Sequence, residues 1–259
     1  METQDFYSHP KYYDIAFNFR GDCASEADFF EECMRRYSKI AVNRVLELAS
    51  GTSPHLAELA RRGYEYVGVD LNPAMLAYAA DKAKRVGASA TFLEADICRF
   101  HLDPQADFAY ITLGSLYVES TEALLSHFQS VAASLRPGGL YVLHWCVEFL
   151  WDLGVNQRYE WTAQQDGITV SVVSSVRDKL VDRVEQICEH RLAADVDDNG
   201  KQLHLESVGR MRVMFPQEFR LLVDTRTEFE FIGWWDGDFS KPIPPTNRPD
   251  WPMTVLRRL

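Results

Sequence analysis

Short apolar runs alternate with longer segments of helical periodicity between residues 40 and 145. Apolar runs of this length are typical of buried strands, and apolar residues recurring every three or four positions are typical of helices that bury one face. Because right-handed crossovers through helices join parallel strands, the alternation predicts a parallel α/β sheet. The expected strands are Arg44–Ala49, Tyr66–Asp70, Thr91–Asp96, Ala106–Leu113 and Leu140–Trp145.

Cap and turn residues mark the expected helix ends. Ser53-Pro54 predicts one helix start, because a hydroxyl caps the backbone amides and proline suits the first turn. Asn72-Pro73 predicts the next start, and Gly87 predicts its end. Apolar residues from Leu124 to Leu135 fall at helical spacing, and we expect Pro137-Gly138-Gly139 to break that third helix.

The flanking segments have different patterns and divide the chain. Residues 1–39 are rich in aromatics and predict a helical cap, with Ser25 as a helix N-cap. Residues 40–154 form the expected core. Residues 155–214 alternate polar and apolar positions around Asp197-Asp-Asn-Gly200, a hairpin signal, and predict a small inserted antiparallel sheet. Residues 215–259 predict a closing helix and two last strands of the main sheet.

Three carboxylates, Glu47, Asp70 and Asp96, stand at the ends of three successive expected strands. The carboxyl ends of parallel strands meet at one edge of a sheet, where ligands bind in open α/β folds. The first strand leads into Ser50-Gly51-Thr52-Ser53, a tight turn in which Gly51 permits a close approach to a ligand. An acid at the position of Asp70 is placed to accept both hydroxyls of a ribose.

Composition limits which partners we expect the protein to bind and in which cellular compartment we expect it. A formal net charge of −11 argues against nucleic acid or an anionic membrane as the main partner. Five cysteines without a C-x-x-C pair argue against a disulfide framework and against a zinc site, and no residue spacing indicates another metal. The N-terminus lacks a signal-peptide pattern, so we expect a cytoplasmic protein. Edges of the inserted sheet suggest a possible homodimer.

The charge at the sheet edge discriminates between two nucleoside-bearing cofactors. A dinucleotide loop of the G-x-G-x-x-G type is missing, because Ser53 and Leu56 occupy the later glycine positions. A pyrophosphate would also be repelled by three carboxylates, whereas a cation would be attracted. The residues therefore favour S-adenosylmethionine over NAD.

Four segments in order resemble the motifs of class I S-adenosylmethionine-dependent methyltransferases. They are Glu47-Leu-Ala-Ser-Gly-Thr-Ser-Pro-His55, Gly68-Val-Asp-Leu-Asn-Pro-Ala-Met-Leu76, Glu94-Ala-Asp-Ile97 and Leu135-Arg-Pro-Gly-Gly-Leu-Tyr141. The flanking segments are similar to those of small-molecule members such as glycine and amino-sugar N-methyltransferases. The resemblance implies a Rossmann-like, doubly wound sheet of seven strands with the last strand antiparallel.

The resemblance also implies which residues surround the cofactor. Those expected to line it are Tyr13, Glu47, Ala49, Gly51, Asp70, Leu71, Asp96, Ile97 and Leu113. Asp96 and the amide of Ile97 are expected to read the adenine edge, and Glu47 to offset the sulfonium charge. Arg20 is a candidate for the cofactor carboxylate, because an N-terminal cap must close over it; a surface ion pair is the alternative.

Candidates for the acceptor side come from the ends of the later strands. His144 is the candidate general base, since it falls near the end of the fifth strand. Tyr117, Trp145 and Trp151 are candidates to contact the acceptor. Arg210 is a candidate to hold an anionic acceptor, with the polar face of a half-exposed sheet as the alternative.

The sequence thus predicts an enzyme that transfers a methyl group from S-adenosylmethionine to a nitrogen or oxygen of a small molecule. The reaction is an in-line displacement that depends mainly on alignment of the acceptor. Two alternatives remain open: a non-catalytic module that binds the cofactor, and an NAD(P)-dependent oxidoreductase.

Overall fold

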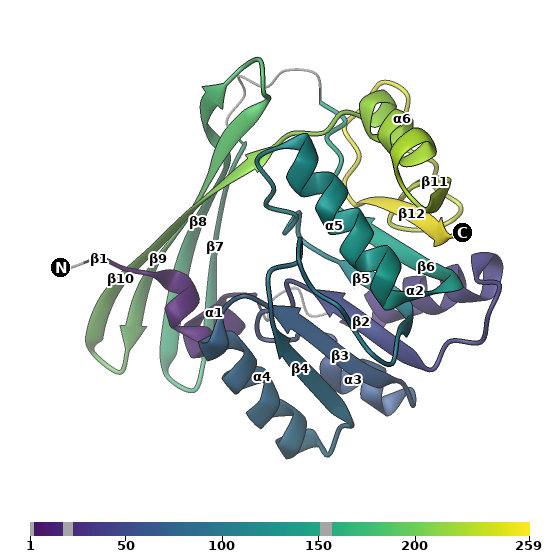
Figure 1. The fold of residues 1–259 in the computed structure, drawn as a ribbon. Helices are drawn as coiled ribbons and strands as arrows, with labels where there is room; N and C mark the ends of the chain where they lie inside the picture. Colours follow the sequence, from purple (N-terminus) through teal and green to yellow (C-terminus); the bar gives the residue numbers. More distant parts are fainter. Residues whose placement is uncertain (1–2, 18–22, 151–156) are drawn as a thin grey trace.

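The computed structural model describes residues 3–17, 23–150 and 157–259, and these residues form two sheets (Figure 1). The main sheet has seven strands in the order β11-β12-β6-β5-β2-β3-β4. Strands β2 to β6 run parallel to one another, and β12 is antiparallel to both of its neighbours. The predicted doubly wound sheet with an antiparallel last strand is confirmed.

The strands and helices of the main unit alternate along the chain as expected. The strands are β2 (Arg44–Leu48), β3 (Glu65–Asp70), β4 (Ala90–Glu94), β5 (Ala106–Ile111), β6 (Leu135–His144), β11 (Phe229–Asp236) and β12 (Pro252–Arg258). The helices are α2 (Cys23–Tyr37), α3 (Leu56–Arg61), α4 (Pro73–Val86), α5 (Thr121–Ser134) and α6 (Pro216–Arg226).

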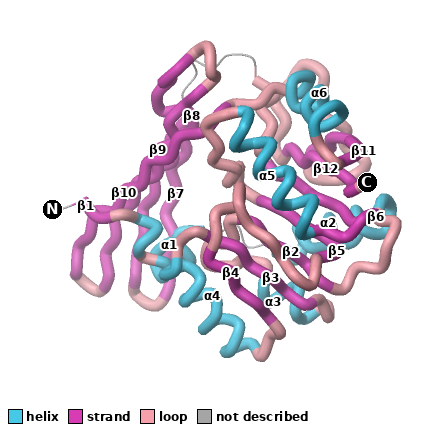
Figure 2. The backbone as a smooth tube through the Cα atoms, in the orientation of Figure 1, coloured by secondary structure: helices cyan, strands magenta, loops and turns pink. Residues whose placement is uncertain are grey.

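Successive residues of each central strand face opposite layers of the core. Leu46 and Ile111 belong to the cluster that packs on α5 and α6, whereas Val45 and Tyr110 belong to the cluster that packs on α2 and α3. Figure 2 shows helices on both faces of this sheet. Because both faces are covered, the strands read as nearly continuous apolar runs.

A second sheet stands beside the carboxyl edge of the first. Its strands β7 (Gln157–Gln165), β8 (Ile168–Asp182), β9 (Ile187–Asp198) and β10 (Lys201–Arg212) pair antiparallel, and β1 (Thr3–Gln4) pairs parallel with β10. A 3-10 helix (Phe6–Ser8) and α1 (Pro10–Phe17) follow β1 and pack on this sheet. The N-terminal segment therefore contributes a strand to the inserted sheet as well as helices.

Local signals located one helix correctly and misplaced three boundaries. Asn72 caps α4 by accepting from the amides of Ala74 and Met75, and Gly87 ends it in the left-handed conformation. The predicted cap at Ser25 is wrong, because α2 already begins at Cys23.

The start predicted at Ser53-Pro54 is also wrong, because Ser53 has a positive φ of 53° and α3 begins only at Leu56. The strand predicted to start at Leu140 begins instead at Leu135, which is also the C-cap of α5. The extended backbone of Leu135, with φ of −117° and ψ of 133°, begins β6 opposite Ala106.

Candidate active site

The loop between β2 and α3 turns sharply at the carboxyl edge of the sheet. Ala49, Gly51 and Ser53 all have positive φ, at 50°, 50° and 53°. The amide of Ser53 closes the turn on the carbonyl of Ser50 at 2.7 Å, and the amide of Ser50 bonds Val69 O at 3.0 Å. Positive φ costs energy for residues with a Cβ, so this compact path is imposed by the surrounding contacts.

Asp70, at the end of β3, holds this loop in place. Its Oδ2 accepts a 2.7 Å hydrogen bond from the Gly51 amide, and its Oδ1 accepts one of 2.8 Å from the Asn72 amide. Burial raises the pKa of Asp70, against the opposing effect of these amides. A carboxylate has about four acceptor positions, and the amides of Gly51, Leu71 and Asn72 take up to three of them, so an acceptor position remains for a ligand. Leu71 beside it is 70% exposed and offers an apolar surface.

Glu47 on β2 is buried within a cluster of polar side chains. Because alternate residues of a strand face the same side, Glu47 faces the same side of β2 as Val45, and that side packs on α2 and α3. One carboxylate oxygen contacts His55 Nδ1 at 3.3 Å, and the other accepts from the Tyr66 hydroxyl. The carboxylate oxygens of Glu47 therefore both have partners within the chain, and its contact with a cofactor stays a prediction.

His55 sits between two carboxylates behind the loop. Its Nε2 contacts Glu26 on α2, and its Nδ1 contacts Glu47. Burial disfavours the imidazolium, but the hydrogen bonds and charges of Glu26 and Glu47 outweigh this effect and raise the pKa of His55 to about 9. His55 is thus cationic at neutral pH and compensates the buried charge of Glu47.

Asp96 and Ile97 follow β4 and continue the same edge. Asp96 is exposed and accepts a 2.8 Å hydrogen bond from the Cys98 amide. The carbonyl of Ile97 accepts from His127 Nδ1 at 2.9 Å, which attaches this segment to α5. Glu47 and Asp70 lie on the paired strands β2 and β3, and Asp96 lies two residues beyond the end of β4, which pairs with β3.

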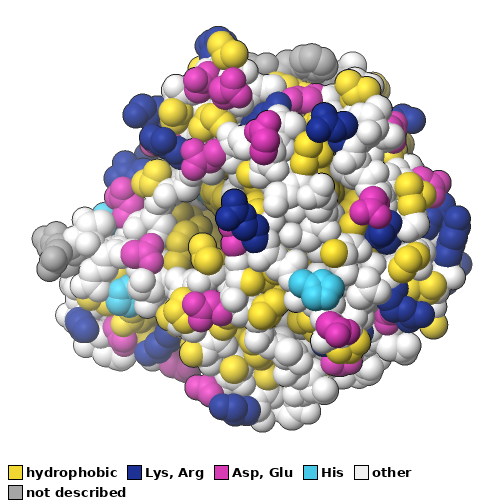
Figure 3. All heavy atoms as spheres, in the orientation of Figure 1, with side chains coloured by type: hydrophobic (Ala, Val, Ile, Leu, Met, Phe, Trp, Pro, Cys, Tyr) yellow, Lys and Arg dark blue, Asp and Glu magenta, His cyan; other side chains and the backbone are white. Residues whose placement is uncertain are grey.

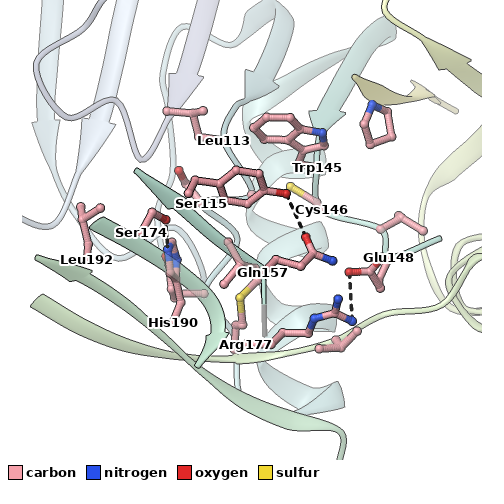
Figure 4. A pocket seen from close by; sticks show the side chains of 18 of the residues that line it. Leu113, Ser115, Trp145, Cys146, Glu148, Gln157, Ser174, Arg177, His190 and Leu192 are labelled. Atoms are coloured by element: carbon pink, nitrogen blue, oxygen red, sulfur yellow. Dashed lines mark hydrogen bonds and ion pairs between the residues drawn. The ribbon is translucent and has the colours of Figure 1, made fainter. Parts of the chain in front are cut away.

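A cavity of about 570 Å³ lies between the carboxyl edge of the main sheet and the inserted sheet. Figure 4 shows Leu113, Ser115 and Trp145 from the main unit facing Ser174, His190 and Leu192 from the inserted sheet. Pockets that bind small ligands have volumes of about 300–1,000 Å³. The cavity therefore has the size of a small-molecule site.

Four of the predicted site residues line this cavity. They are Tyr13, Leu113, Tyr117 and Trp145. Tyr13 also lies beside the loop between β2 and α3, since its Cε1 lies 3.9 Å from the position a Cβ on Gly51 would take. Tyr13 therefore lies where the carboxyl edge of the main sheet meets the cavity.

Other predicted residues lie elsewhere. His144 is fully buried and does not line the cavity, and its ring contacts those of Trp145 and Trp251 at 4.6 and 4.4 Å between centroids. Arg210 is exposed, is not part of the lining, and pairs with Glu189 at 3.4 Å. Arg20 and Trp151 fall outside the described residues.

The cavity also contains polar residues that the sequence reasoning missed. Arg177 is buried in the lining and pairs with Glu148 at 3.4 Å (Figure 4). Ser174 on β8 pairs with Leu192 on the neighbouring strand β9, and its Oγ lies 2.9 Å from His190 Nε2 on the same strand β9. The alternation of side chains along β9 could have identified His190 from the sequence, because His190 faces the same side of this strand as Leu192 and Val196.

Comparison with known proteins identifies the family. Residues 45–139 match the model of the methyltransferase domain family. The chain is 31% identical over 182 residues to the dTDP-3-amino-3,4,6-trideoxy-alpha-D-glucopyranose N,N-dimethyltransferase of Streptomyces venezuelae, covering 68% of this chain and 73% of that protein. The chain belongs to the S-adenosylmethionine-dependent methyltransferases.

Solved structures of methyltransferases share the whole fold. An S-adenosylmethionine-dependent methyltransferase from Clostridium acetobutylicum ATCC 824 superposes with a TM-score of 0.77 at 16% identity, covering 96% of this chain and 98% of that one. Streptomyces venezuelae DesVI gives a TM-score of 0.74 at 23% identity, with 97% and 98% covered. The inserted sheet is therefore part of the shared architecture.

This methyltransferase uses S-adenosylmethionine to methylate a small molecule, as the sequence predicted. Family membership favours that cofactor over the nicotinamide alternative and an enzyme over a non-catalytic module. None of the described helices has the length and apolarity needed to cross a membrane. Within residues 3–17, 23–150 and 157–259, no three His, Cys, Asp or Glu side chains are grouped so that they could hold a metal ion.

Proposed function

We propose that this methyltransferase acts on an amine of a small polar molecule, with an aminodeoxy sugar as the leading class of acceptor. The observation that carries the proposal is the cavity of about 570 Å³. Tyr13 lines this cavity and lies beside the loop between β2 and α3, so the cavity extends from that loop to the inserted sheet. The relative that acts on a dTDP-amino sugar gives the acceptor class.

The cofactor would be held along the carboxyl edge of β2, β3 and β4. Asp70 retains an acceptor position for the ribose hydroxyls, and Leu71 provides an apolar surface for the adenine. Asp96 and Ile97 would border the adenine edge, while Ala49 and Gly51 shape the loop. Tyr13 and Leu113 would border the methionine part. These carboxylate acceptors and apolar surfaces fit a nucleoside with a positive charge.

The cofactor, when bound, supplies a methyl carbon on a positively charged sulfur, from which the carbon transfers to the acceptor nitrogen as the C–S bond breaks and the N–C bond forms. The chain's residues align the acceptor and exclude water. Aromatic rings of Tyr13, Phe17, Trp145 and Trp161 line the cavity, and such rings attract cations. We expect the cavity to attract an amine as its ammonium, which must lose one proton to water before the nitrogen lone pair can attack the methyl carbon.

A panel of acceptors tests this function. The chain would be incubated with S-adenosylmethionine carrying a labelled methyl group and with dTDP-3-amino-3,4,6-trideoxy-α-D-glucopyranose, its 3-hydroxy counterpart, free amino sugars and glycine. Mass spectrometry is expected to find a methylated product with an amino sugar and none with the 3-hydroxy compound. Methylation of hydroxyl compounds alone would contradict the proposal.

We also propose that the methyltransferase forms a homodimer in the cytoplasm. The support is the inserted sheet, whose β7 has a neighbour on one side only among the described strands. On the face shown in Figure 3, Lys and Arg side chains are interspersed with Asp and Glu, which fits a small-molecule substrate better than nucleic acid. Light scattering coupled to size-exclusion chromatography tests the dimer; a monomer mass at micromolar concentration would exclude it.

A further inference from the structure

A hydrogen-bonded chain of three side chains crosses from the main unit to the inserted sheet. The Tyr117 hydroxyl contacts His190 Nδ1, and His190 Nε2 lies 2.9 Å from Ser174 Oγ. All three residues line the cavity. Figure 4 shows Ser174 and His190 together on its inner wall. Tyr117 and His190 are 73 residues apart in sequence, so only the fold brings them together.

The fold makes room for this contact at a glycine. His190 on β9 pairs with Gly209 on β10, and a Cβ on Gly209 would lie 2.6 Å from Cε1 of Tyr117. The Tyr117 ring therefore rests directly on the backbone of β10. It is nearly parallel to the His190 ring, with 7° between the planes and 6.0 Å between the centroids. Any other residue at this position would push Tyr117 away from His190.

The surroundings of His190 keep its imidazole neutral. Burial lowers the pKa of His190 to about 4. The titratable groups that interact with Tyr117 are Tyr7 and Tyr13, and burial raises the pKa of Tyr7 to about 12. His190, Tyr7 and Tyr117 are therefore uncharged at neutral pH. Of the two neutral tautomers, the one with the proton on Nε2 donates to Ser174 and leaves Nδ1 to accept from the Tyr117 hydroxyl, and this is the tautomer that we assign to His190.

We propose that His190 is a positioning residue that fixes the Tyr117 hydroxyl as a hydrogen-bond acceptor for an N–H of the acceptor amine. With the Tyr117 proton donated to His190 and the Tyr7 hydroxyl hydrogen-bonded to the same oxygen, one lone pair of the Tyr117 oxygen is left for the cavity. An amine that donates one N–H to this oxygen has its own lone pair directed elsewhere. This inference rests on the proposed function, and it specifies that the acceptor is an amine with at least one N–H.

The consequence is a limit on the extent of methylation. A neutral primary amine keeps N–H groups while its lone pair attacks, and so does a secondary amine. A neutral tertiary amine has no N–H to donate to Tyr117. After each transfer the product ammonium loses one proton to water, which restores a lone pair only for the first two rounds. We therefore expect the enzyme to stop at the dimethylamine and to form no quaternary ammonium.

Variants of the chain separate positioning from folding. With dTDP-3-amino-3,4,6-trideoxy-α-D-glucopyranose as the probe, His190→Leu and Tyr117→Phe are each expected to lower kcat/KM by about 10- to 100-fold. His190→Asn places an amide oxygen near the position of Nδ1 and should restore most of the activity. His204→Leu is the matched control, since His204 lies on β10 and pairs with Asp195 instead of lining the cavity. Unchanged kcat/KM in His190→Leu, or a quaternary product from the natural sequence, would overturn the proposal.

Nitrogen NMR of the histidine side chains tests the arrangement without any acceptor. In protein saturated with S-adenosylhomocysteine at pH 7, His190 is expected as the neutral tautomer with the proton on Nε2, and Tyr117→Phe should shift the Nδ1 resonance. A His190 protonated on Nδ1 would refute the positioning role even if amines are methylated. Lack of methylation of every amine with the expected tautomer present would instead count against the proposed function.

Discussion

The Gly51 amide donates a 2.7 Å hydrogen bond to Oδ2 of Asp70, which ties the tight turn after β2 to the end of β3. One carboxylate thereby shapes the loop and remains available to a ligand at the same time. The two strands are neighbours in the sheet, so the contact is set by their pairing. A change at Asp70 is expected to affect both the loop and the cofactor.

Replacing Asp70 should weaken cofactor binding. Asp70→Ala removes the acceptor for Gly51 and the proposed acceptor for the ribose, and leaving such polar partners unpaired costs about 1–3 kcal/mol. Isothermal titration with S-adenosylmethionine measures the loss. Asp81→Ala is the control, because Asp81 is exposed on α4 and pairs only at the surface with Lys84 at 3.1 Å. Equal affinities in the two variants would show that Asp70 does not contact the ribose.

The stability of the protein should fall as the pH rises above neutral. The pKa of His55 is raised from 6.5 to about 9 in the folded state, so its contribution is fully present below pH 6.5 and is lost as the pH rises through 9. A shift of this size corresponds to about 3 kcal/mol. Urea unfolding between pH 6.5 and 9.5 measures the trend.

The Glu26→Gln variant shows whether His55 causes this trend. The amide removes one of the two charges that stabilise the imidazolium while it keeps the size of the side chain. The decline between pH 6.5 and 9.5 should therefore be smaller in Glu26→Gln than in the natural sequence. A decline of the same size in both would assign the pH dependence to other groups.

Gly114 should not tolerate a side chain. Its φ is +64°, and an added Cβ would lie 3.0 Å from the carbonyl oxygen of Trp145, at the edge of the cavity. Gly114→Ala should lower stability by about 1–3 kcal/mol and raise KM for the acceptor, because strain and displacement of Trp145 add. Gly87→Ala is the control with a similar φ of +67° and no atom within 4 Å. Thermal unfolding should show a larger loss of stability for Gly114→Ala than for Gly87→Ala. Equal losses of stability would mean that the contact with Trp145 does not contribute.

Two arginines two residues apart should differ in their importance. Arg212 joins three elements, since it donates to Thr121 Oγ1 at 2.5 Å at the start of α5 and to Glu218 on α6. Arg210 has only an exposed pair with Glu189. Arg212→Ala should cost about 2–3 kcal/mol in urea unfolding, whereas Arg210→Ala should cost less than about 0.5 kcal/mol. Similar losses would show that Arg212 does not hold these elements together.

Features specified by neighbouring residues could be predicted from the sequence. Asn72, Pro73 and Gly87 define α4 through contacts within a few residues, and they act as expected. Ser25 and Ser53 carry the same local signal but do not cap helices. The contact of Ser50 with Val69, which belongs to another strand, competes with the local preference of that loop.

The sequence by itself determined the α/β class, the acidic residues that follow successive strands, and the cofactor. Strand and helix periodicity and the motifs at strand ends are local properties, so they can be read from neighbouring residues. Only the tertiary structure decided that Glu47 is compensated by His55 and that Tyr117 meets His190. Those pairs depend on which faces of distant strands come together. That choice results from burying apolar faces across the whole chain, so no short segment encodes it.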